Sequence, residues 1–509
     1  IVGLTPLFEA NLEGKKYIME DYRLFIGGEF VKNSNQEYFP TINPYTNKMW
    51  ANIPQASESQ VADAISVARV TFETTWSKVS GIERARLLNK LADLLVENGD
   101  RMGLLESTDN GKVIRETRSQ MNFAARQYRF FAGYADKLWG KVIPLDQPNI
   151  LDYTQREPIG VAVLITAWNS PLGCLSNKLA PALAAGNCVV IKPSEHASVT
   201  TLEFAKLVEQ AGFPPGVVNM VAGDAIVGKA LLTSGRIDRV SFTGSPGVGR
   251  EIAANAGRAL VPSTMELGGK SPNIIFEDAD LPKAIVGALA GIFAATGQTC
   301  IAGSRLLVQR KIYDHVAENL IERATQIRMG NPIDIATEMG TAANEPQFNR
   351  ILASIKGAID EGAELATGGG RAEGKDLENG FFVQPTIFTN VSNSMKIAQE
   401  EVFGPVLSII PFDEEEEAVT IGNDTKYGLA SGIWTTDLNR AMRMSNAIRA
   451  GTVWVNTYRS VAVQAPFGGF KDSGFGRERG EIALDEFTNT KNVMIDYSDE
   501  ERDPFAIKA

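Results

Sequence analysis

The chain has 509 residues, which exceeds the ~250–300 residues that usually share one hydrophobic core. Its net charge of -11 at pH 7 repels nucleic acid phosphates and anionic membrane surfaces. Its apolar runs stop short of the ~18 residues that a membrane helix needs. We therefore expect two or more domains and a small-molecule ligand, with no nucleic acid and no membrane as partner.

The cysteines indicate a reducing compartment. Cys174, Cys188 and Cys300 are too few, and odd in number, for a disulfide framework. We therefore expect a cytoplasmic protein. Residues 1–18 have neither the apolar core of a signal peptide nor the Arg and Ser bias of a transit peptide, and Met19 is a candidate natural start. We leave residues 1–18 out of the fold prediction.

The first long section, from Ser57 to Ala135, is predicted to be helical. Apolar residues recur at helical spacing in SQVADAISVARVTF and RARLLNKLADLLVENG. The pattern then changes to short β-branched runs, GVAVLITAW, GNCVVIKPS, GVVNMVAG and DRVSFTGS, with helical segments such as TLEFAKLVEQAG between them. This alternation predicts a parallel α/β sheet.

A second α/β section runs from PNIIFEDAD through SRLLVQR, VLSIIPF and GTVWVN to the glycine-rich FGGFKDSGFGRERG. Two other segments, WGKVIPLDQPNILDYTQREPIG and TNTKNVMIDYS, are predicted to be strands without a core of their own. We expect these strands to pair elsewhere. No repeat or Pro-rich linker separates the two α/β sections, so a ligand site between closely packed domains is expected.

Cys300 is the candidate nucleophile. It lies in GIFAATGQTCIAG, where Gly297, Gly303 and small side chains allow close approach of a ligand to the backbone. A lone cysteine is more often a buried structural residue, and a catalytic thiol needs a base or a positive environment. The contexts of His196 and His315, the two histidines, are those of surface or capping residues, which disfavours a cysteine protease.

Glu266, in TMELGGKSPN, is the candidate base. It precedes Gly268 and Gly269 at a predicted strand end, where partial desolvation raises the pKa of a carboxyl group. A single glutamate is more often an ordinary surface acid. Its combination with Cys300 favours the catalytic interpretation.

The cofactor candidates follow two predicted strands. RVSFTGSPGVGREIA places Gly244 and Gly249 between a strand and a helix, which suits a pyrophosphate. The spacing is not the usual dinucleotide fingerprint, and any tight turn favours glycine. Lys192 and Glu195 in VVIKPSE end another strand, where a carboxylate binds ribose hydroxyls and repels a 2′-phosphate. These residues favour NAD over NADP.

Seven segments, ITAWNSPL, VVIKPSE, SFTGSPGVG, MELGGKSPN, GQTCIAG, EEVFGPV and PFGGFKDSGFGR, together resemble the aldehyde dehydrogenase superfamily in order and spacing. The resemblance covers nearly the whole chain from about residue 21. It implies an α/β fold with two Rossmann-type domains and a small β oligomerisation arm, and hence a homodimer or homotetramer. The implied ranges are 21–136 and 160–268 for the NAD-binding domain, 269–476 for the catalytic domain, and 137–159 and 487–498 for the arm.

The resemblance also implies residue roles. Cys300 corresponds to the nucleophile, Glu266 to the general base, Asn169 with the Cys300 backbone N–H to the oxyanion hole, and Lys178 to an active-site lysine. The implied NAD contacts are Thr166, Trp168, Lys192, Ser194, Glu195, Gly223, Gly244, Ser245, Gly249, Leu267, Gly268, Glu401 and Phe403. The implied reaction is thiolate attack on an aldehyde, hydride transfer to NAD, and hydrolysis of the thioester by water that Glu266 activates. No metal is implied.

The implied substrate tunnel is more polar than in family members that act on simple aliphatic aldehydes. Those members commonly carry aromatic residues where this chain has Ser170 and Asn177. Arg459, and Arg126 or Arg129 on a helix expected to border the tunnel, are candidates to bind a carboxylate, although Arg126 and Arg129 have solvent exposure as the alternative. A carboxylated, muconic-type semialdehyde is the hypothesis. The remaining predicted tunnel residues are Tyr458 and Phe467.

Two other functional classes remain open from the sequence. One is a cysteine-dependent hydrolase or esterase without redox chemistry, and the other is a non-catalytic structural use of the same fold. The combination of Cys300, Glu266 and Asn169 argues against the structural role. The residues assigned to the cofactor argue against simple hydrolysis.

Overall fold

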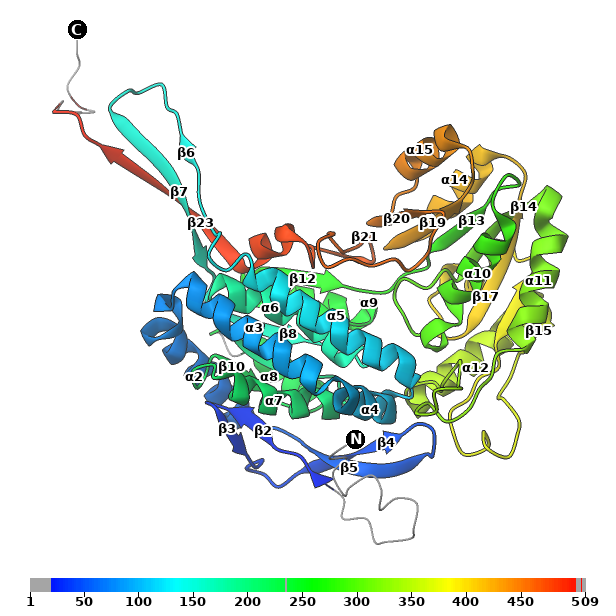
Figure 1. Cartoon of the computed structure of the whole chain (residues 1–509), viewed down its shortest axis with the longest axis horizontal. Coiled ribbons are helices and arrows are strands. Elements are labelled where there is room, and N and C mark those ends of the chain that lie inside the picture. The colour runs from blue at the N-terminus through cyan, green and yellow to red at the C-terminus, as the bar shows by residue number, and fades with distance from the viewer. Residues whose placement is uncertain (1–19, 234–235, 500–504, 506–509) are drawn as a thin grey trace.

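Two large sheets with helices packed against them make up most of the molecule (Figure 1). The computed structural model describes residues 20–233, 236–499 and 505. The candidate start at Met19 lies outside the described residues. Within those ranges, no helix is both long and apolar enough to cross a membrane.

The chain begins with short strands and then forms the predicted helices. Strands β2 and β3 extend one edge of the first large sheet, while β1, β5 and β4 form a separate small sheet. The bounds are β1 (Glu20–Asp21), β2 (Leu24–Ile26), β3 (Glu29–Val31), β4 (Tyr38–Asn43), β5 (Lys48–Pro54), α2 (Glu58–Thr74), η2 (Trp76–Lys78), α3 (Gly81–Glu97), α4 (Gly99–Asn110) and α5 (Ile114–Ala132). Helix α3 shows why these segments are helical: Leu87, Leu88, Leu91 and Leu95 form one buried stripe at helical spacing.

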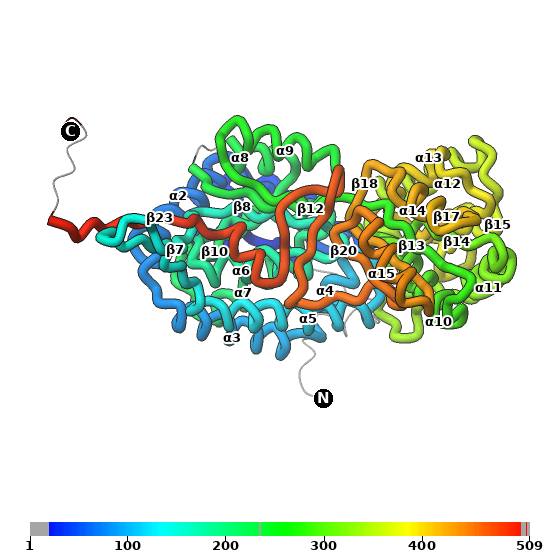
Figure 2. The backbone as a smooth tube through the Cα atoms, turned by 90° about the horizontal axis from the view of Figure 1, so that it is seen from above, coloured from blue at the N-terminus to red at the C-terminus, as the bar shows by residue number. Residues whose placement is uncertain are grey.

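The first large sheet has the strand order β22-β12-β11-β8-β9-β10-β2-β3. Its five central strands are parallel, which confirms the predicted α/β architecture. Helices α8 and α9 lie on one side of the sheet and α3 and α5 on the other (Figure 2). The bounds are β8 (Val161–Ile165), α6 (Pro171–Ala185), β9 (Cys188–Lys192), α7 (Val199–Ala211), β10 (Val218–Met220), α8 (Ala225–Thr233), β11 (Arg239–Thr243), α9 (Pro246–Arg258) and β12 (Ser263–Glu266).

The second large sheet has the order β15-β16-β17-β14-β13-β19-β20 and is parallel except for β15. The bounds are β13 (Pro272–Ile275), α10 (Leu281–Ile292), η3 (Ala294–Gly297), β14 (Arg305–Gln309), η4 (Arg310–Ile312), α11 (Tyr313–Thr325), α12 (Glu345–Asp360), β15 (Glu364–Thr367), β16 (Thr386–Thr389), α13 (Lys396–Gln399), β17 (Val406–Phe412), α14 (Glu415–Asn423), β18 (Tyr427–Gly428), β19 (Ala430–Trp434), α15 (Leu438–Ala447), β20 (Thr452–Val455) and β21 (Phe470–Lys471). Strands β18 and β21 pair with each other.

After β21 the chain returns to the first sheet. Strand β22 (Gly474–Phe475) falls in the range 269–476 predicted for the catalytic domain, but it pairs antiparallel with β12, with Gly474 opposite Glu266. The next segment, residues 476–480, which we call the return segment, leads into η5 (Glu481–Phe487) against α6. The return segment therefore brings side chains from late in the sequence to the end of β12.

A three-stranded sheet projects from the first large sheet (Figures 1 and 2). It consists of β6 (Val142–Ile143), β7 (Ile150–Pro158) and β23 (Thr488–Asp496). Strands β7 and β23 are antiparallel along their whole length, from Thr488 opposite Pro158 to Asp496 opposite Ile150. The two predicted segments without a core therefore pair with each other, a partner that the sequence did not identify.

Candidate active site

Cys300 follows a loop with an unusual backbone. Ala295, Thr296 and Gly297 have φ values of 53°, 57° and 68°. For a residue other than glycine, this left-handed region costs about 1–2 kcal/mol. Glu116 of α5 offsets part of the cost, because its Oε1 accepts a hydrogen bond from the Ala295 N–H at 2.9 Å. Such strain is concentrated at functional sites.

Gln298 fixes the next part of this loop and links it to Asn169. Its Nε2 donates to the Thr341 carbonyl at 3.1 Å, and its Oε1 accepts from the Ala343 N–H at 2.9 Å. The Asn169 side-chain amide donates to the Gln298 carbonyl at 2.9 Å. The structure therefore brings Asn169 beside the loop that carries Cys300, as the predicted oxyanion role requires.

The Cys300 thiol is neutral at neutral pH in this environment. Burial raises the pKa of the thiol, and the charges of Glu266 and Glu401 raise it further, while Arg479 lowers it. A thiol in such an environment needs a base to become a nucleophile. The residue is half-buried rather than sealed, so a ligand can reach it.

Glu266, the candidate general base, has a buried carboxyl group at the end of β12. The residue is 4% exposed, and neither carboxyl oxygen has a hydrogen-bond partner among the described residues. Burial raises the pKa of Glu266 well above its ordinary value, Glu478 raises it further, and Lys178 lowers it. Buried polar atoms are rarely left without partners, and such exceptions often mark a catalytic role.

Lys178 reaches this site through an ion pair that the sequence analysis did not predict. It lies on α6, is fully buried, pairs with Glu478 of the return segment, and donates to Ser241 Oγ at 3.1 Å. The charges of Lys178 and Glu478 act on the pKa of Glu266 in opposite directions. The sequence signal for Glu478 was its place in the glycine-rich FGRERG segment, but its partner lies 300 residues away.

The turn between β11 and α9 has the geometry of an anion site. Ser245 caps α9 by accepting a hydrogen bond from the Val248 N–H at 3.4 Å. A Cβ at Gly249 would overlap the Leu267 side chain, so glycine is required for α9 to pack this closely on the end of β12. The N–H groups of the first helical turn bind anions such as a pyrophosphate well.

The carboxyl end of β9 supplies polar groups beside this turn. Lys192 is buried, its Nζ lies 3.6 Å from Glu195 Oε2, and burial lowers its pKa while Glu195 raises it. Thr166, at the end of β8, has a buried hydroxyl without a partner in the described part of the chain. Ser194 is buried near the same strand end, and Gly223 follows β10 with a φ of 151°. These groups fit a ligand rich in hydroxyls and phosphates.

A second cluster continues from this turn toward Cys300. Glu401 accepts a hydrogen bond from the Gly269 N–H at 2.9 Å, and burial raises its pKa to about 7. A Cβ at Gly268 would overlap the Glu401 carboxylate. Phe403 packs edge-on against Trp168, with ring centroids 5.2 Å apart. Gly269 also lies against the Cys300 carbonyl, so this cluster adjoins the nucleophile loop.

Three predicted substrate residues lie around buried polar groups. Asn177 is 5% exposed and accepts hydrogen bonds from Gln127 Nε2 at 2.7 Å and from Arg479 Nε at 3.1 Å. The Arg479 guanidinium lies 4.5 Å from the Phe467 ring centroid. Arg479 was not among the predicted site residues, although it lies in the same FGRERG segment as Glu478.

Ser170, the third of these residues, contacts a buried cation. Its Oγ accepts a hydrogen bond from Lys112 Nζ at 2.7 Å and donates to the Asn169 carbonyl at 2.8 Å. Lys112 also donates to that carbonyl and to Gln120 Oε1. The three hydrogen bonds match the three donors of the ammonium group, so Lys112 fixes the segment before α6.

For Arg126 and Arg129 the structure shows solvent exposure, which is one of the two alternatives that the sequence left open, and not the substrate contact. Arg126 is exposed, and Arg129 is exposed and pairs with Asp93 of α3 at 2.7 Å. Helix α5 turns Gln127, rather than either arginine, toward Asn177. The helical pattern in the sequence predicts α5 but does not show how the helix is rotated about its axis. It therefore could not decide whether these arginines face the site or solvent.

The loop after β20 also differs from the predicted tunnel wall. Tyr458 is 8% exposed, and its hydroxyl donates to the Ile301 carbonyl at 3.0 Å. This hydrogen bond fixes the residue that follows Cys300. Arg459 is half-buried with a φ of 58° and donates from Nη1 to the Ala290 carbonyl at 3.2 Å. Of these two residues, Arg459 retains donors for a ligand.

Comparisons with known proteins show which family this chain is similar to. The sequence model described as "Aldehyde dehydrogenase family" matches residues 30–493. A protein named aldehyde dehydrogenase from Emericella nidulans is 46% identical, with 94% of this chain and 95% of that protein covered. The (Z)-2-((N-methylformamido)methylene)-5-hydroxybutyrolactone dehydrogenase of Acinetobacter baylyi is 44% identical, with 96% and 100% covered.

The solved structures include similar molecules. A betaine aldehyde dehydrogenase from Staphylococcus aureus, in complex with NAD+, superposes with a TM-score of 0.94 at 38% identity. The superposition covers 95% of this chain and 97% of that one. The likeness therefore extends over both large sheets and the projecting arm.

Proposed function

The chain belongs to the aldehyde dehydrogenase family and is an oxidoreductase that acts on aldehydes, and from this premise we propose that it oxidises its aldehyde to a carboxylic acid with NAD+ as acceptor. The observation that carries the proposal is the unpartnered, buried Glu266 carboxyl group in electrostatic reach of the Cys300 thiol. The α9 N-terminus and the unpartnered Thr166 hydroxyl support dinucleotide binding. The Glu195 carboxylate supports a preference for NAD+ over NADP+.

The first covalent step uses the residues around Cys300. The Cys300 thiol loses its proton to solvent, and Sγ forms a bond to the aldehyde carbon while the carbonyl π electrons move to oxygen. We assign the Asn169 amide, which lies beside the nucleophile loop, and the Cys300 N–H as the donors to this oxygen in the thiohemiacetal. When bound, NAD+ supplies the acceptor for the hydride that leaves the former aldehyde carbon. Loss of the hydride leaves an acyl group on Cys300 as a thioester.

Glu266 then serves the hydrolytic half of the cycle. Its ionised carboxylate takes a proton from water as the water oxygen bonds to the thioester carbon. The C–S bond of the tetrahedral intermediate then breaks, which releases the carboxylic acid and regenerates the Cys300 thiolate. The Lys178–Glu478 ion pair affects the ionisation of Glu266 throughout, because both charges act on it in a buried environment.

We propose a carboxylated, muconic-type semialdehyde as the substrate class. The polar groups Ser170 and Asn177 and the half-buried Arg459 support a substrate with a charged or polar distal end. A cationic substrate such as betaine aldehyde is disfavoured, because cations are recognised by aromatic cages rather than beside guanidinium groups.

A kinetic panel tests the proposed function. Purified protein is mixed with NAD+ and with aliphatic, aromatic, cationic and carboxylated aldehydes, and absorbance at 340 nm is followed. NADH should form, with the highest kcat/KM for a carboxylated semialdehyde and a lower one with NADP+. Hydrolysis of an activated ester without NADH or NADPH from any aldehyde would favour the hydrolase alternative instead.

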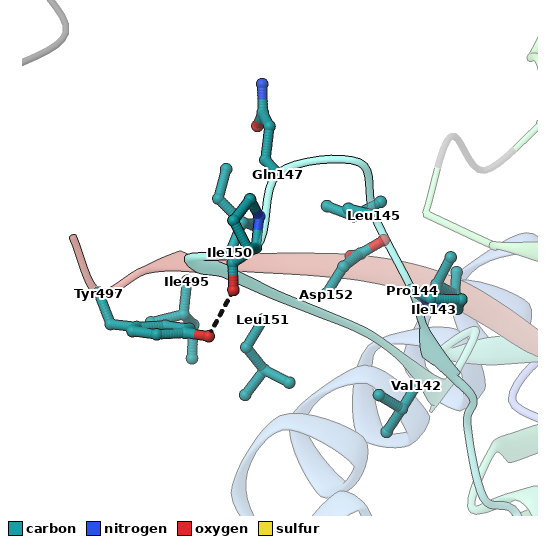
Figure 3. A pocket seen from close by; sticks show the side chains of 11 residues that line it. Val142, Ile143, Pro144, Leu145, Gln147, Ile150, Leu151, Asp152, Ile495 and Tyr497 are labelled. Carbon is teal, nitrogen blue, oxygen red and sulfur yellow. Dashed lines mark hydrogen bonds between the residues drawn. The ribbon is translucent and has the colours of Figure 1, made fainter.

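The projecting arm supports a proposed homodimer or homotetramer. A hollow of about 500 Å³ lies between its strands and the turn that joins them (Figure 3). Tyr497 closes one end, with its hydroxyl donating to the Pro148 carbonyl at 2.7 Å. Apolar side chains on this sheet, including Val142 at 75% and Met494 at 59%, are exposed in the single chain. Exposed apolar patches of this kind mark protein interfaces.

We also propose a cytoplasmic location. Cys174, Cys188 and Cys300 are all free thiols, and Cys300 must remain reduced to act as a nucleophile. Detection of a Cys174–Cys300 disulfide in protein isolated under thiol-blocking conditions would contradict this location.

A further inference from the structure

Arg479 is an arginine with an unusual environment beside the reactive thiol. It lies in the return segment with a φ of 60°. Its guanidinium carbon lies 4.5 Å from the Phe467 ring centroid and 5.0 Å from the Phe123 ring centroid. Burial lowers the pKa of this group, while the charges of Glu478 and Cys300 raise it. The side chain is therefore a cation held between two aromatic rings within electrostatic reach of Cys300.

The hydrogen bonds of Arg479 leave most of its donors free. Nε donates to Asn177 Oδ1 at 3.1 Å, and Asn177 is itself held by Gln127. Among the described residues, neither Nη1 nor Nη2 donates to a protein acceptor, and no carboxylate lies within ion-pair distance of the guanidinium. Glu478, the adjacent acid, is paired with Lys178.

Two buried arginines elsewhere in the molecule each engage at least one Nη group with an acceptor of the chain. Arg305 is fully buried and donates to the carbonyls of Lys270, Ile421 and Gly422. Arg239 pairs with Glu486. Arg479 is half-buried, and in the described part of the chain neither of its Nη groups has an acceptor. Both groups are therefore available to an acceptor from outside the chain.

We propose that Arg479 binds the carboxylate of the substrate through Nη1 and Nη2 while the aldehyde carbon of the same molecule lies at Cys300. The proposal rests on the proposed function and deepens it, because it names the residue that selects the acidic substrate. Two parallel N–H···O bonds from one guanidinium match the two oxygens of a carboxylate. Asn177 and the rings of Phe123 and Phe467 orient the guanidinium for this contact.

Paired substrates test this role. 6-Oxohexanoate and its methyl ester carry the same aldehyde, but only the first has a distal carboxylate. Arg479→Leu should lower kcat/KM for 6-oxohexanoate by about 100-fold, mainly through KM, because charge-assisted hydrogen bonds are lost. It should lower kcat/KM for the methyl ester much less, by under about 10-fold, since the ester makes no ion pair and loses only the effect of the Arg479 charge on the Cys300 thiol. Arg479→Lys should recover part of the loss, because it keeps the charge but not the fork geometry.

Arg118→Leu is the matched control. Arg118 is an exposed arginine of α5 that pairs with Asp100 at 3.0 Å, so both substrates should keep their wild-type kinetics. An equal loss on both substrates in Arg479→Leu, or no loss on either, would overturn the proposal. Equal loss would instead mean that Arg479 acts on Cys300 or on the fold.

Equilibrium binding separates this proposal from the proposed function. Adipate, an unreactive dicarboxylate, is titrated into wild-type protein and Arg479→Leu by calorimetry, with circular dichroism to verify folding of both. Wild-type protein should bind adipate at least about 30-fold more tightly, in line with the loss of charged hydrogen bonds. If no aldehyde is oxidised but this difference is present, the proposed function fails and the anion site stands. Equal affinity of the two proteins overturns the anion site.

Discussion

At the residue scale, Cys300 and Glu266 are linked by their shifted pKa values. Burial raises the pKa of both groups, so the charged form of each is less favoured than it would be in water. A neutral thiol is a poor nucleophile, and a neutral carboxyl group cannot accept a proton. Activity therefore requires conditions that ionise Glu266, and the surrounding charges of Lys178 and Glu478 adjust where this happens.

Glu266→Gln should separate the two halves of the reaction. Hydride transfer from the thiohemiacetal does not need water, so one NADH per active site should form in a rapid burst. Thioester hydrolysis should then fall by about 10²–10⁴-fold, which is the usual contribution of a general base. Stopped-flow absorbance at 340 nm measures both phases. Steady turnover at the wild-type rate would exclude Glu266 as the hydrolytic base.

The raised pKa of Glu266 determines the direction in which hydrolytic turnover depends on pH. The carboxylate is the active form, and a raised pKa means that it is lost as pH falls through a value above the usual carboxyl range. Hydrolytic turnover of the wild-type protein should therefore rise with pH across that window and level off above it. In Glu266→Gln the residual turnover should lack this step, and a persistent step would assign it to another group.

At the element scale, the loop before Cys300 depends on one glycine. Gly297 has a φ of 68°, and a Cβ there would overlap the Gly404 carbonyl. Gly297→Ala should lower kcat at least about 10-fold, since small displacements of reacting groups cost ~10²-fold. The melting temperature should fall as well, because the left-handed region penalises alanine. Gly257→Ala in α9 is the control, as a Cβ there meets open space.

Glu195, which follows the end of β9, is expected to set the preference between NAD+ and NADP+. Glu195 lies beside the buried Lys192, where its carboxylate would repel a 2′-phosphate. Glu195→Gln should raise kcat/KM for NADP+ relative to NAD+ by about 10-fold, which corresponds to ~1.4 kcal/mol. Initial rates with the two cofactors measure the ratio. An unchanged ratio would place the discrimination at other residues.

The elements also explain which features could be predicted from the sequence. Strands β8, β9 and β11 are buried on both faces, so their continuous apolar runs reveal them without any tertiary information. The Lys178–Glu478 pair and the Asn177–Arg479 hydrogen bond join residues about 300 positions apart, and no local pattern encodes them. The two alternatives for Arg129 show the same limit, because the helical pattern predicts α5 but not which face meets α6.

At the scale of the whole molecule, the site depends on the return of the chain from the second sheet to the first. Strand β22 pairs with β12 and places the return segment beside Glu266. Residues from both large sheets and from α5 therefore meet at Cys300. Motif order along the sequence predicted the two α/β sections and the arm, whereas this crossing depends on a two-residue strand with no sequence signature.

The exposed apolar side chains of the projecting arm lead us to expect that the chain forms oligomers through it. Wild-type protein should elute with a mass that is a multiple of the 55.1 kDa chain in light-scattering chromatography. Combined Leu151→Glu and Met494→Glu substitutions should shift the population toward monomer, because charges would be buried in an apolar contact. Leu438→Glu, at an exposed apolar position of α15, should not. A wild-type monomer, or an unchanged assembly in the double variant, would contradict an arm interface.

The most direct test of the account is to locate the acyl group. Glu266→Gln protein is mixed with NAD+ and an aldehyde substrate, quenched in acid after the NADH burst, and measured by intact-protein and peptide mass spectrometry. The account predicts one acyl group per chain, carried as a thioester on the peptide that contains Cys300. NADH formation with no adduct, or with the adduct on Cys174 or Cys188, would contradict it.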